Sequence, residues 1–181
     1  MNQKNSYDIG KVLREMREEY WRGIEEVGES VAETADYLVF GLDGERFGLP
    51  TKVIREVLRL PKMVRVPRVP ESIRGVINLR GQIVAVTDLR PLLGLAGRET
   101  PASARLVVVE AAGVTTALLA EQVEGIRSLP TAAVEPLTSG LTGFPREVAL
   151  GQVAESGGFL ILLDLDCILS RPELIVDQQG E

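Results

Sequence analysis

Histidine is absent from this chain of 181 residues, and cysteine occurs once, at Cys167. Without histidine the chain has no imidazole to act as a general base, to complete a Ser/His triad or to ligate a metal. A single cysteine forms no internal disulfide, as is typical of proteins in a reducing cytoplasm. Cys167 lies in the apolar stretch LLDLDCILS, so we expect it to be a small packing residue.

Aromatic residues and excess positive charge are scarce as well. Phe, Trp and Tyr make up 4% of the chain, and its 20 basic and 26 acidic residues give a net charge of −6. Nucleic-acid-binding surfaces combine a basic stripe with stacking aromatics, so we predict no nucleic-acid partner.

Long apolar runs are missing too. Residues 1–11 are polar and charged, unlike a signal segment. The most apolar stretch, GFLILLDLDCIL, is shorter than a membrane-spanning helix and contains two aspartates. We therefore expect a soluble cytoplasmic protein with no direct membrane insertion.

No catalytic constellation stands out. The stretches SGG and AAG lack the spacing and the lysine of a phosphate-binding loop, and no zinc-ligand spacing occurs. Asp164 and Asp166 are close in sequence, but we interpret them as a helix cap and a solvated neighbour rather than a carboxylate pair. We predict no enzymatic activity and no cofactor.

Residues Asp8 to Gly28 have the pattern of an amphipathic helix. Apolar residues recur at three- and four-residue steps, Asp8 is an expected N-cap and Gly28 an expected stop. The stripe either packs on the chain's own body or serves as a docking or dimerising element, for which Tyr20-Trp21 offers an interface anchor. The polar face carries both signs of charge, which argues against membrane binding.

The rest of the chain is β-rich. Asp43-Gly44 lies between two strand-like runs and predicts a hairpin. The stretch TKVIREVLRLP has apolar residues at helical spacing and predicts a short helix ended by Pro61. Asp88 and Gly94 bracket DLRPLLG, which predicts another short helix.

The second half of this body repeats the first. An offset of 69 positions aligns ARLVVVEAAGVTTALLAEQVEGIRSLP with DYLVFGLDGERFGLPTKVIREVLRLP, and an offset of 76 aligns Gly75 with Gly151 and Asp88 with Asp164. We predict a mainly β fold of two related small barrels, approximately residues 36–100 and 101–174. Residues 1–35 form an N-terminal extension and residues 175–181 a tail.

The two copies differ at one turn. Asn78-Leu79-Arg80 of the first copy aligns with Ala154-Glu155-Ser156 of the second, so the fold itself does not require an arginine there. Three interpretations remain open for Arg80: an exposed turn residue, a structural ion pair with Glu56, or a contact to a partner, since arginine is enriched at interface hot spots.

The segment IRGVINLRGQIVAVTDLRPLLG resembles the signature of the CheW family, the adaptor proteins of bacterial chemotaxis and related signalling arrays. The resemblance extends from about Tyr37 to Leu174. It implies two packed, five-stranded SH3-like barrels without enzymatic activity. It also implies two partners: the cytoplasmic tip of methyl-accepting chemoreceptors, and a histidine kinase whose regulatory domain is itself CheW-like. The same fold serving twitching or gliding motility, or a second-messenger pathway, is the alternative.

The resemblance also assigns roles to residues. It implies partner binding by the family's signature arginine, by a glutamate near it, and by three neighbouring motif positions: Arg80, Glu56, Ile54, Gly75 and Asn78. It implies a structural role for the motif residues Gly81, Asp88 and Leu89. Two departures stand out: Ala85 replaces a frequent proline, and the stretch AEQV at residues 120–123 replaces the frequent VDxV.

Overall fold

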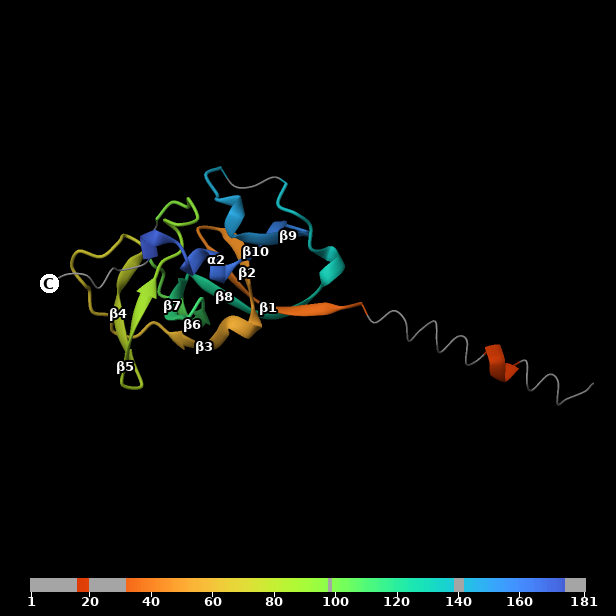
Figure 1. The fold of residues 1–181 in the computed structure, drawn as a ribbon, viewed down its shortest axis with the longest axis horizontal. Coiled ribbons are helices and arrows are strands. Elements are labelled where there is room, and N and C mark those ends of the chain that lie inside the picture. Colours follow the sequence, from red (N-terminus) through yellow and green to blue (C-terminus); the bar gives the residue numbers. More distant parts are fainter. Residues whose placement is uncertain (1–15, 20–31, 98, 139–141, 175–181) are drawn as a thin grey trace, which may run out of the picture. The chain divides into compact units, whose positions relative to one another are not determined.

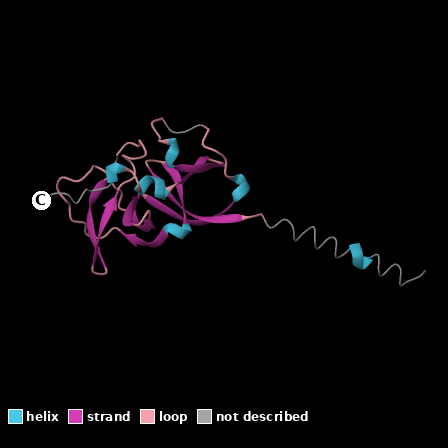
Figure 2. Ribbon diagram, in the orientation of Figure 1, coloured by secondary structure: helices cyan, strands magenta, loops and turns pink. Residues whose placement is uncertain are grey.

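The computed structural model describes residues 16–19, 32–97, 99–138 and 142–174. The chain divides after Glu33 into two units, and the second, Thr34–Glu181, contains every strand described (Figure 1). Strands dominate this unit, and its helices are single short turns (Figure 2). Of the helix predicted from Asp8 to Gly28, only residues 16–19 are described; they are helical and exposed. The rest of that prediction, and the tail 175–181, lies outside the described residues.

The strands form two five-stranded sheets. Sheet 1 has the order β8-β1-β2-β10-β9 and sheet 2 the order β3-β6-β7-β5-β4. The strands are β1 (Thr34–Leu42), β2 (Glu45–Pro50), β3 (Ile54–Arg59), β4 (Ile73–Leu79), β5 (Gln82–Thr87), β6 (Arg105–Ala111), β7 (Val114–Ala120), β8 (Gln122–Pro130), β9 (Ala149–Glu155) and β10 (Gly158–Leu163). All pairs are antiparallel except β2 with β10 and β5 with β7.

The predicted repeat is confirmed by this topology. The offsets of 69 and 76 positions match β1 to β6, β2 to β7, β3 to β8, β4 to β9 and β5 to β10. Replacing each strand of sheet 1 by its match gives the strand order of sheet 2. The two parallel pairs, β2 with β10 and β7 with β5, correspond in the same way.

The two sequence halves nevertheless do not form one sheet each. Strands β1 and β2 of the first copy pair with β8 and β10 of the second, while β6 and β7 of the second copy pair with β3 and β5 of the first. Each sheet is thus shared by both copies, and residue 100 does not separate the sheets. A short loop keeps consecutive strands close, but it does not decide which sheet the third strand of each copy joins.

Three apolar clusters stabilise the unit. The largest is formed by residues of both sheets, among them Phe40 and Phe47 of sheet 1 and Val107 and Leu118 of sheet 2. Each sheet also has a smaller cluster of its own, around Val86 and Leu106 in sheet 2 and around Leu160 and Leu162 in sheet 1. The central strands therefore bury apolar side chains on both faces, which is why they read as nearly continuous apolar runs.

The helix predicted over TKVIREVLRLP is wrong. Only Thr51–Val53 form a short 3-10 turn, and Ile54–Arg59 is strand β3, paired with β6. Its burial alternates strictly between half-buried and exposed positions, as expected for an edge strand. Ile54 and Leu58 fit a period of 2 as well as a period of 3.6, whereas Val57 fits only the helical period and is exposed on the strand. Pairing with β6 decides for the strand.

The second predicted short helix is only partly correct. Residues 90–94 form a turn, not a helix, although Leu93 N–H donates to the carbonyls of Leu89 and Arg90 at 2.9 and 3.2 Å. The matching segment of the second copy is a helix, α2 (Leu165–Leu169), and Asp164 caps it by accepting from Cys167 N–H at 2.9 Å. Asp88 instead accepts from Arg90 N–H at 3.0 Å. The same carboxylate also binds the side chain of Arg90.

Candidate functional site

Arg80 stands at the tip of the β4–β5 hairpin. It has φ 51° and the following Gly81 has φ 88°, the paired positive values of a type I′ turn. Asn78 stabilises the turn, because its side-chain oxygen accepts from Gly81 N–H at 2.7 Å. The left-handed conformation is unfavourable for a residue as large as arginine. The matching turn differs, since neither Ser156 nor Gly157 has a positive φ.

Glu56 holds the Arg80 guanidinium across the open end of sheet 2. Arg80 Nη2 donates to Glu56 Oε2 at 2.8 Å, which joins the hairpin tip to strand β3. The arginine side chain is 78% exposed and the glutamate side chain 23% exposed. Two of the three interpretations of Arg80 therefore apply together: it is an exposed turn residue and it forms an ion pair with Glu56. The remaining donors of the guanidinium face solvent.

Gly75 serves a close backbone approach. A Cβ at this position would lie 2.4 Å from the Val64 carbonyl oxygen. Val64 and Val76 exchange two backbone hydrogen bonds, of 2.9 and 2.8 Å, and so fix the connection 60–72 to β4. Gly75 thus shapes the same hairpin that carries Arg80.

Two of the residues singled out from sequence lie away from this surface. Ile54 is half-buried and packs against the central cluster. Leu89 is fully buried in the same cluster. The structure therefore brings Asn78, Arg80 and Gly81 together in one hairpin turn with Glu56 of β3 beside it, while Ile54 and Leu89 belong to the central apolar cluster.

Asp88 belongs to a buried charge network that the sequence did not reveal. Its carboxylate is 1% exposed and accepts from Arg90 Nε at 2.9 Å and Nη2 at 2.7 Å. Arg90 is fully buried, and its Nη1 donates to Glu121 Oε1 at 2.7 Å. Glu121 in turn accepts from the N–H of Asp43 at 3.0 Å. The network links the end of β5 in sheet 2 to the β1–β2 turn of sheet 1.

Arg90 stays charged in this network. Its hydrogen bond to Asp88 raises the pKa of the guanidinium above its ordinary value, and this outweighs the opposing effect of burial. A buried cation of this kind is stable only while its carboxylate partners are present, because an unpaired buried charge destabilises the fold.

Arg90 and Glu121 are the residues that sequence reasoning missed. The repeat contains a signal that would have singled out Arg90. The offset of 76 aligns it with Asp166, a reversal of charge, just as it aligns Arg80 with the uncharged Ser156. Asp166 accepts from the N–H of Ala112 at 2.7 Å, in the β6–β7 turn that matches Asp43.

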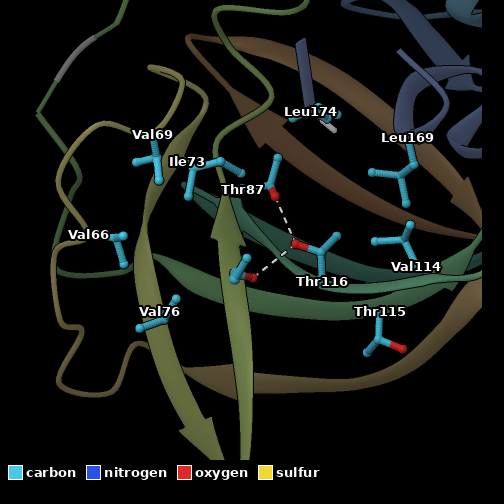
Figure 3. Close-up of a pocket in the computed structure, with 11 residues that line it drawn as sticks. Val66, Val69, Ile73, Val76, Thr87, Val114, Thr115, Thr116, Leu169 and Leu174 are labelled. Atoms are coloured by element: carbon cyan, nitrogen blue, oxygen red, sulfur yellow. Dashed lines mark hydrogen bonds between the residues drawn. The ribbon is translucent and has the colours of Figure 1, made fainter. Parts of the chain in front are cut away.

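An open apolar groove lies on sheet 2 near the other end of the β4–β5 hairpin (Figure 3). Its volume is about 490 Å³, and Val66 and Ile73 face Leu169 and Val114 across it. Two of its hydroxyl groups are hydrogen-bonded within the protein. The Thr116 hydroxyl bonds to the Thr87 hydroxyl at 2.8 Å and donates to the Ala85 carbonyl at 2.9 Å. The groove thus offers apolar surface without an unpaired hydroxyl on these two threonines.

Two further features of the described residues bear on other functions. Within the ranges described, no three His, Cys, Asp or Glu side chains are arranged to hold a metal ion. Nor does any helix in those ranges have the length and apolar character needed to cross a membrane.

Comparison with known proteins places the chain in a family. A family model described as the CheW-like domain matches residues 36–173. The chemotaxis protein CheW of Klebsiella aerogenes is 26% identical over 147 residues, covering 81% of this chain and 87% of that protein. The protein FrzA of Myxococcus xanthus is 30% identical over 122 residues, covering 67% of this chain and 76% of that protein.

A solved structure agrees with these matches. The scaffolding protein TtCheW from Thermoanaerobacter tengcongensis superposes with a TM-score of 0.69 at 26% identity, covering 78% of this chain and 96% of that one. The chain therefore belongs to the CheW-like domain family, the adaptor family that its Asn-Leu-Arg-Gly … Asp-Leu-Arg motif indicated.

Proposed function

We propose that this protein is a non-enzymatic adaptor that couples chemoreceptors to a histidine kinase in a chemotaxis-type signalling array. Its partners are the cytoplasmic tip of a methyl-accepting receptor and the CheW-like regulatory domain of the kinase. It works in the cytoplasm and is recruited to membrane-associated arrays through the receptor. The family membership and the relatives named as chemotaxis proteins support this function.

The observation that carries the proposal is the Arg80–Glu56 pair. An arginine with φ 51° is strained in a turn whose counterpart carries Ser156, so the fold gains nothing from it. Glu56 orients one edge of the guanidinium and leaves its other donors exposed. Such a fork of donors suits a carboxylate or a backbone carbonyl on a partner.

The alternative pathway keeps the same mechanism. FrzA is 30% identical to this chain and the CheW of Klebsiella aerogenes is 26% identical. The domain is therefore not restricted to proteins named for chemotaxis. An adaptor in twitching or gliding motility, or in second-messenger control, would use the same Arg80 surface with a different receptor and kinase.

The test is reconstitution with a chemoreceptor fragment and a histidine kinase from the same source. Arg80→Ala and Glu56→Lys are each expected to weaken binding to at least one of them by more than about tenfold, the effect of losing an interface hot spot. A double exchange, Arg80→Glu with Glu56→Arg, restores the ion pair but removes the cation from the hairpin tip. It is expected to remain defective.

Ser156→Ala is the matched control, because it alters the corresponding turn of the second copy. Unfolding curves of all variants establish that the fold is intact. Full binding by the double exchange would return Arg80 to a purely structural role. Failure of the wild-type protein to bind either partner would overturn the adaptor function.

A further inference from the structure

The groove over sheet 2 has a counterpart over sheet 1, and that counterpart is filled. The repeat offsets match three groove residues to residues of sheet 1 and its neighbouring turn: Thr116 to Phe47, Thr87 to Leu163, and Leu169 to Leu93. On the sheet 1 side these three residues and Phe144 belong to one apolar cluster. The repeated architecture therefore shows what such a site accepts.

Phe144 is the side chain that fills the sheet 1 site. It is 7% exposed, and its ring stacks on Phe47 with centroids 6.3 Å apart and planes 16° from parallel. Its backbone is held close, since a Cβ on Gly94 would lie 2.5 Å from the Gly143 carbonyl oxygen. Gly143 and Phe144 are not helical, so the ring is presented by a turn followed by an irregular segment.

Sheet 2 lacks the corresponding aromatic ring. Phe144 comes from the longer connection 131–148 and follows Gly143, whose φ is 84°. In the connection 60–72 the matching turn residue is Arg68, with φ 61°, and Val69-Pro70 stands where Phe144-Pro145 stands in the second copy. Val69 is half-buried and lines the groove, so the chain places a small valine in sheet 2 where it places an aromatic ring in sheet 1.

The rim of the open groove is basic although the whole chain is acidic. The connection 60–72 carries three basic residues and one acidic residue, in a chain of net charge −6. Arg65 is exposed and lines a hollow that shares Val66, Val69 and Ile73 with the groove. Arg74, in the same hollow, is 40% exposed and lies 3.8 Å from the Asp88 carboxylate, and the exposed Glu71 is the one acidic residue of that hollow. This charge favours an acidic occupant.

We propose that the sheet 2 groove binds an aromatic side chain presented by an acidic, non-helical segment of a partner protein, seated as Phe144 is seated over sheet 1. The ring enters between Val76 and Leu169, and the acidic neighbours meet Arg65 and Arg74. The inference rests on the proposed adaptor function, because it names the chemistry by which one partner is held.

A peptide tests the groove without either partner. The probe is Asp-Gly-Phe-Pro-Glu-Glu, which presents phenylalanine after glycine, as the chain's own loop does, and adds acidic neighbours. It is expected to shift the methyl resonances of Thr87, Thr116 and Leu169 in the full-length protein, and less so at high salt. A peptide with alanine in place of phenylalanine is expected to shift none of them. Equal shifts with both peptides, or shifts confined elsewhere, would overturn the proposal.

Val114→Glu tests the groove with partners present. Val114 lines the groove and is 44% exposed, and its counterpart in sheet 1 is Glu45, so the change installs the other copy's residue at a tolerant position. It is expected to weaken binding of the peptide, and of one partner, by more than about tenfold. Arg65→Glu is expected to act in the same direction. Glu45→Gln, at the position that matches Val114, is the matched control, and Arg146→Glu is a charge reversal on the filled side; both are expected to change neither.

The outcomes separate this inference from the adaptor function. If Arg80→Ala weakens partner binding while Val114→Glu leaves every partner at wild-type affinity, the groove inference fails and the adaptor function stands. If no partner binds the wild-type protein, the adaptor function fails and the peptide still decides the chemistry of the groove. If Val114→Glu changes the oligomeric state of the protein alone, the occupant is a second copy of this chain, and the proposal is wrong.

Discussion

The β1–β2 turn of sheet 1 and the β6–β7 turn of sheet 2 occupy matching places, yet different chemistry holds them. The N–H of Asp43 donates to Glu121, which Arg90 of the other sheet's final turn holds in place. The N–H of Ala112 donates directly to Asp166, the residue that the repeat aligns with Arg90. In both cases the segment following one sheet braces the first hairpin of the other.

The comparison shows that matching positions of the repeat, Arg90 and Asp166, both help to hold a hairpin turn of the other sheet although their side chains carry opposite charges. Asp166 binds the β6–β7 turn directly with its carboxylate. Arg90 binds the β1–β2 turn indirectly, through a buried network of three charges that also includes Asp88 and Glu121. This network depends most on Arg90, because its guanidinium binds both carboxylates.

Arg90→Ala is the change with the largest expected effect. It removes the guanidinium that both carboxylates bind and leaves the buried Asp88 with Arg74, at 3.8 Å, as its nearest cation, so the free energy of unfolding should fall by about 3–5 kcal/mol. Asp166→Ala removes one exposed hydrogen bond from the matching brace and should cost about 1 kcal/mol. Denaturant unfolding of the two variants measures the difference. Equal losses would mean that the two braces are energetically alike despite their different chemistry.

Alanine at Gly75 or Gly151 should have the next largest effect, and here the copies should agree. The added Cβ would lie 2.4 Å from the Val64 carbonyl oxygen at Gly75 and 2.7 Å from the Glu135 carbonyl oxygen at Gly151. Each change forces a paired connection away from its sheet, at an expected cost of about 1–3 kcal/mol. Unfolding midpoints test this. A loss at only one site would show that the two connections are not equivalent supports.

Arg80→Ala should change stability by less than about 0.5 kcal/mol, because the ion pair it breaks is exposed and alanine keeps the same turn strain. Ser156→Ala in the matching turn should be equally silent in unfolding. The two variants should separate only in partner binding, where Arg80→Ala alone is defective. A loss of stability as large as that of the glycine variants would make Arg80 part of the fold.

The sequence carried enough information for the repeat, the Asp43-Gly44 hairpin and the strand content, because these depend on local spacing. The positive φ values of 51° at Asp43 and 83° at Gly44 confirm the hairpin. The exchange of strands between the sheets was not predictable, because it depends on which distant edges pair. The helix expected around Ile54 failed for the same reason: pairing with β6 overrode an ambiguous apolar period.

Part of the site was also predictable. The resemblance implied that Glu56 lies near Arg80, and their hydrogen bond of 2.8 Å shows that it does, although on a strand rather than on a helix. The binding role of this pair stays a prediction. Arg90 was overlooked because a charged residue in a short motif is read as exposed, and its complete burial follows from two acids that are distant in sequence from one another.

The last expected effect depends on pH and concerns an exposed ion pair in which the two copies exchange the signs of charge. Glu124 of β8 pairs with Arg46, while its counterpart in the repeat, Arg55 of β3, pairs with Glu110. The hydrogen bond from Arg46 lowers the pKa of Glu124 below its ordinary value of 4.5. The unfolded chain therefore binds more protons as the pH falls, so the pair stabilises the fold above that value and loses its contribution as the pH drops through the folded pKa.

Glu124→Gln should accordingly lower the free energy of unfolding by no more than about 1 kcal/mol at neutral pH, and by less with each step toward about pH 3. Added salt should shrink the difference at neutral pH, since both side chains are about one-third exposed. Unfolding curves of the wild type and the variant across this range provide the measurement. A difference that stays constant, or grows on acidification, would show that the carboxylate acts by packing and that the charge of Glu124 contributes nothing to the sheet.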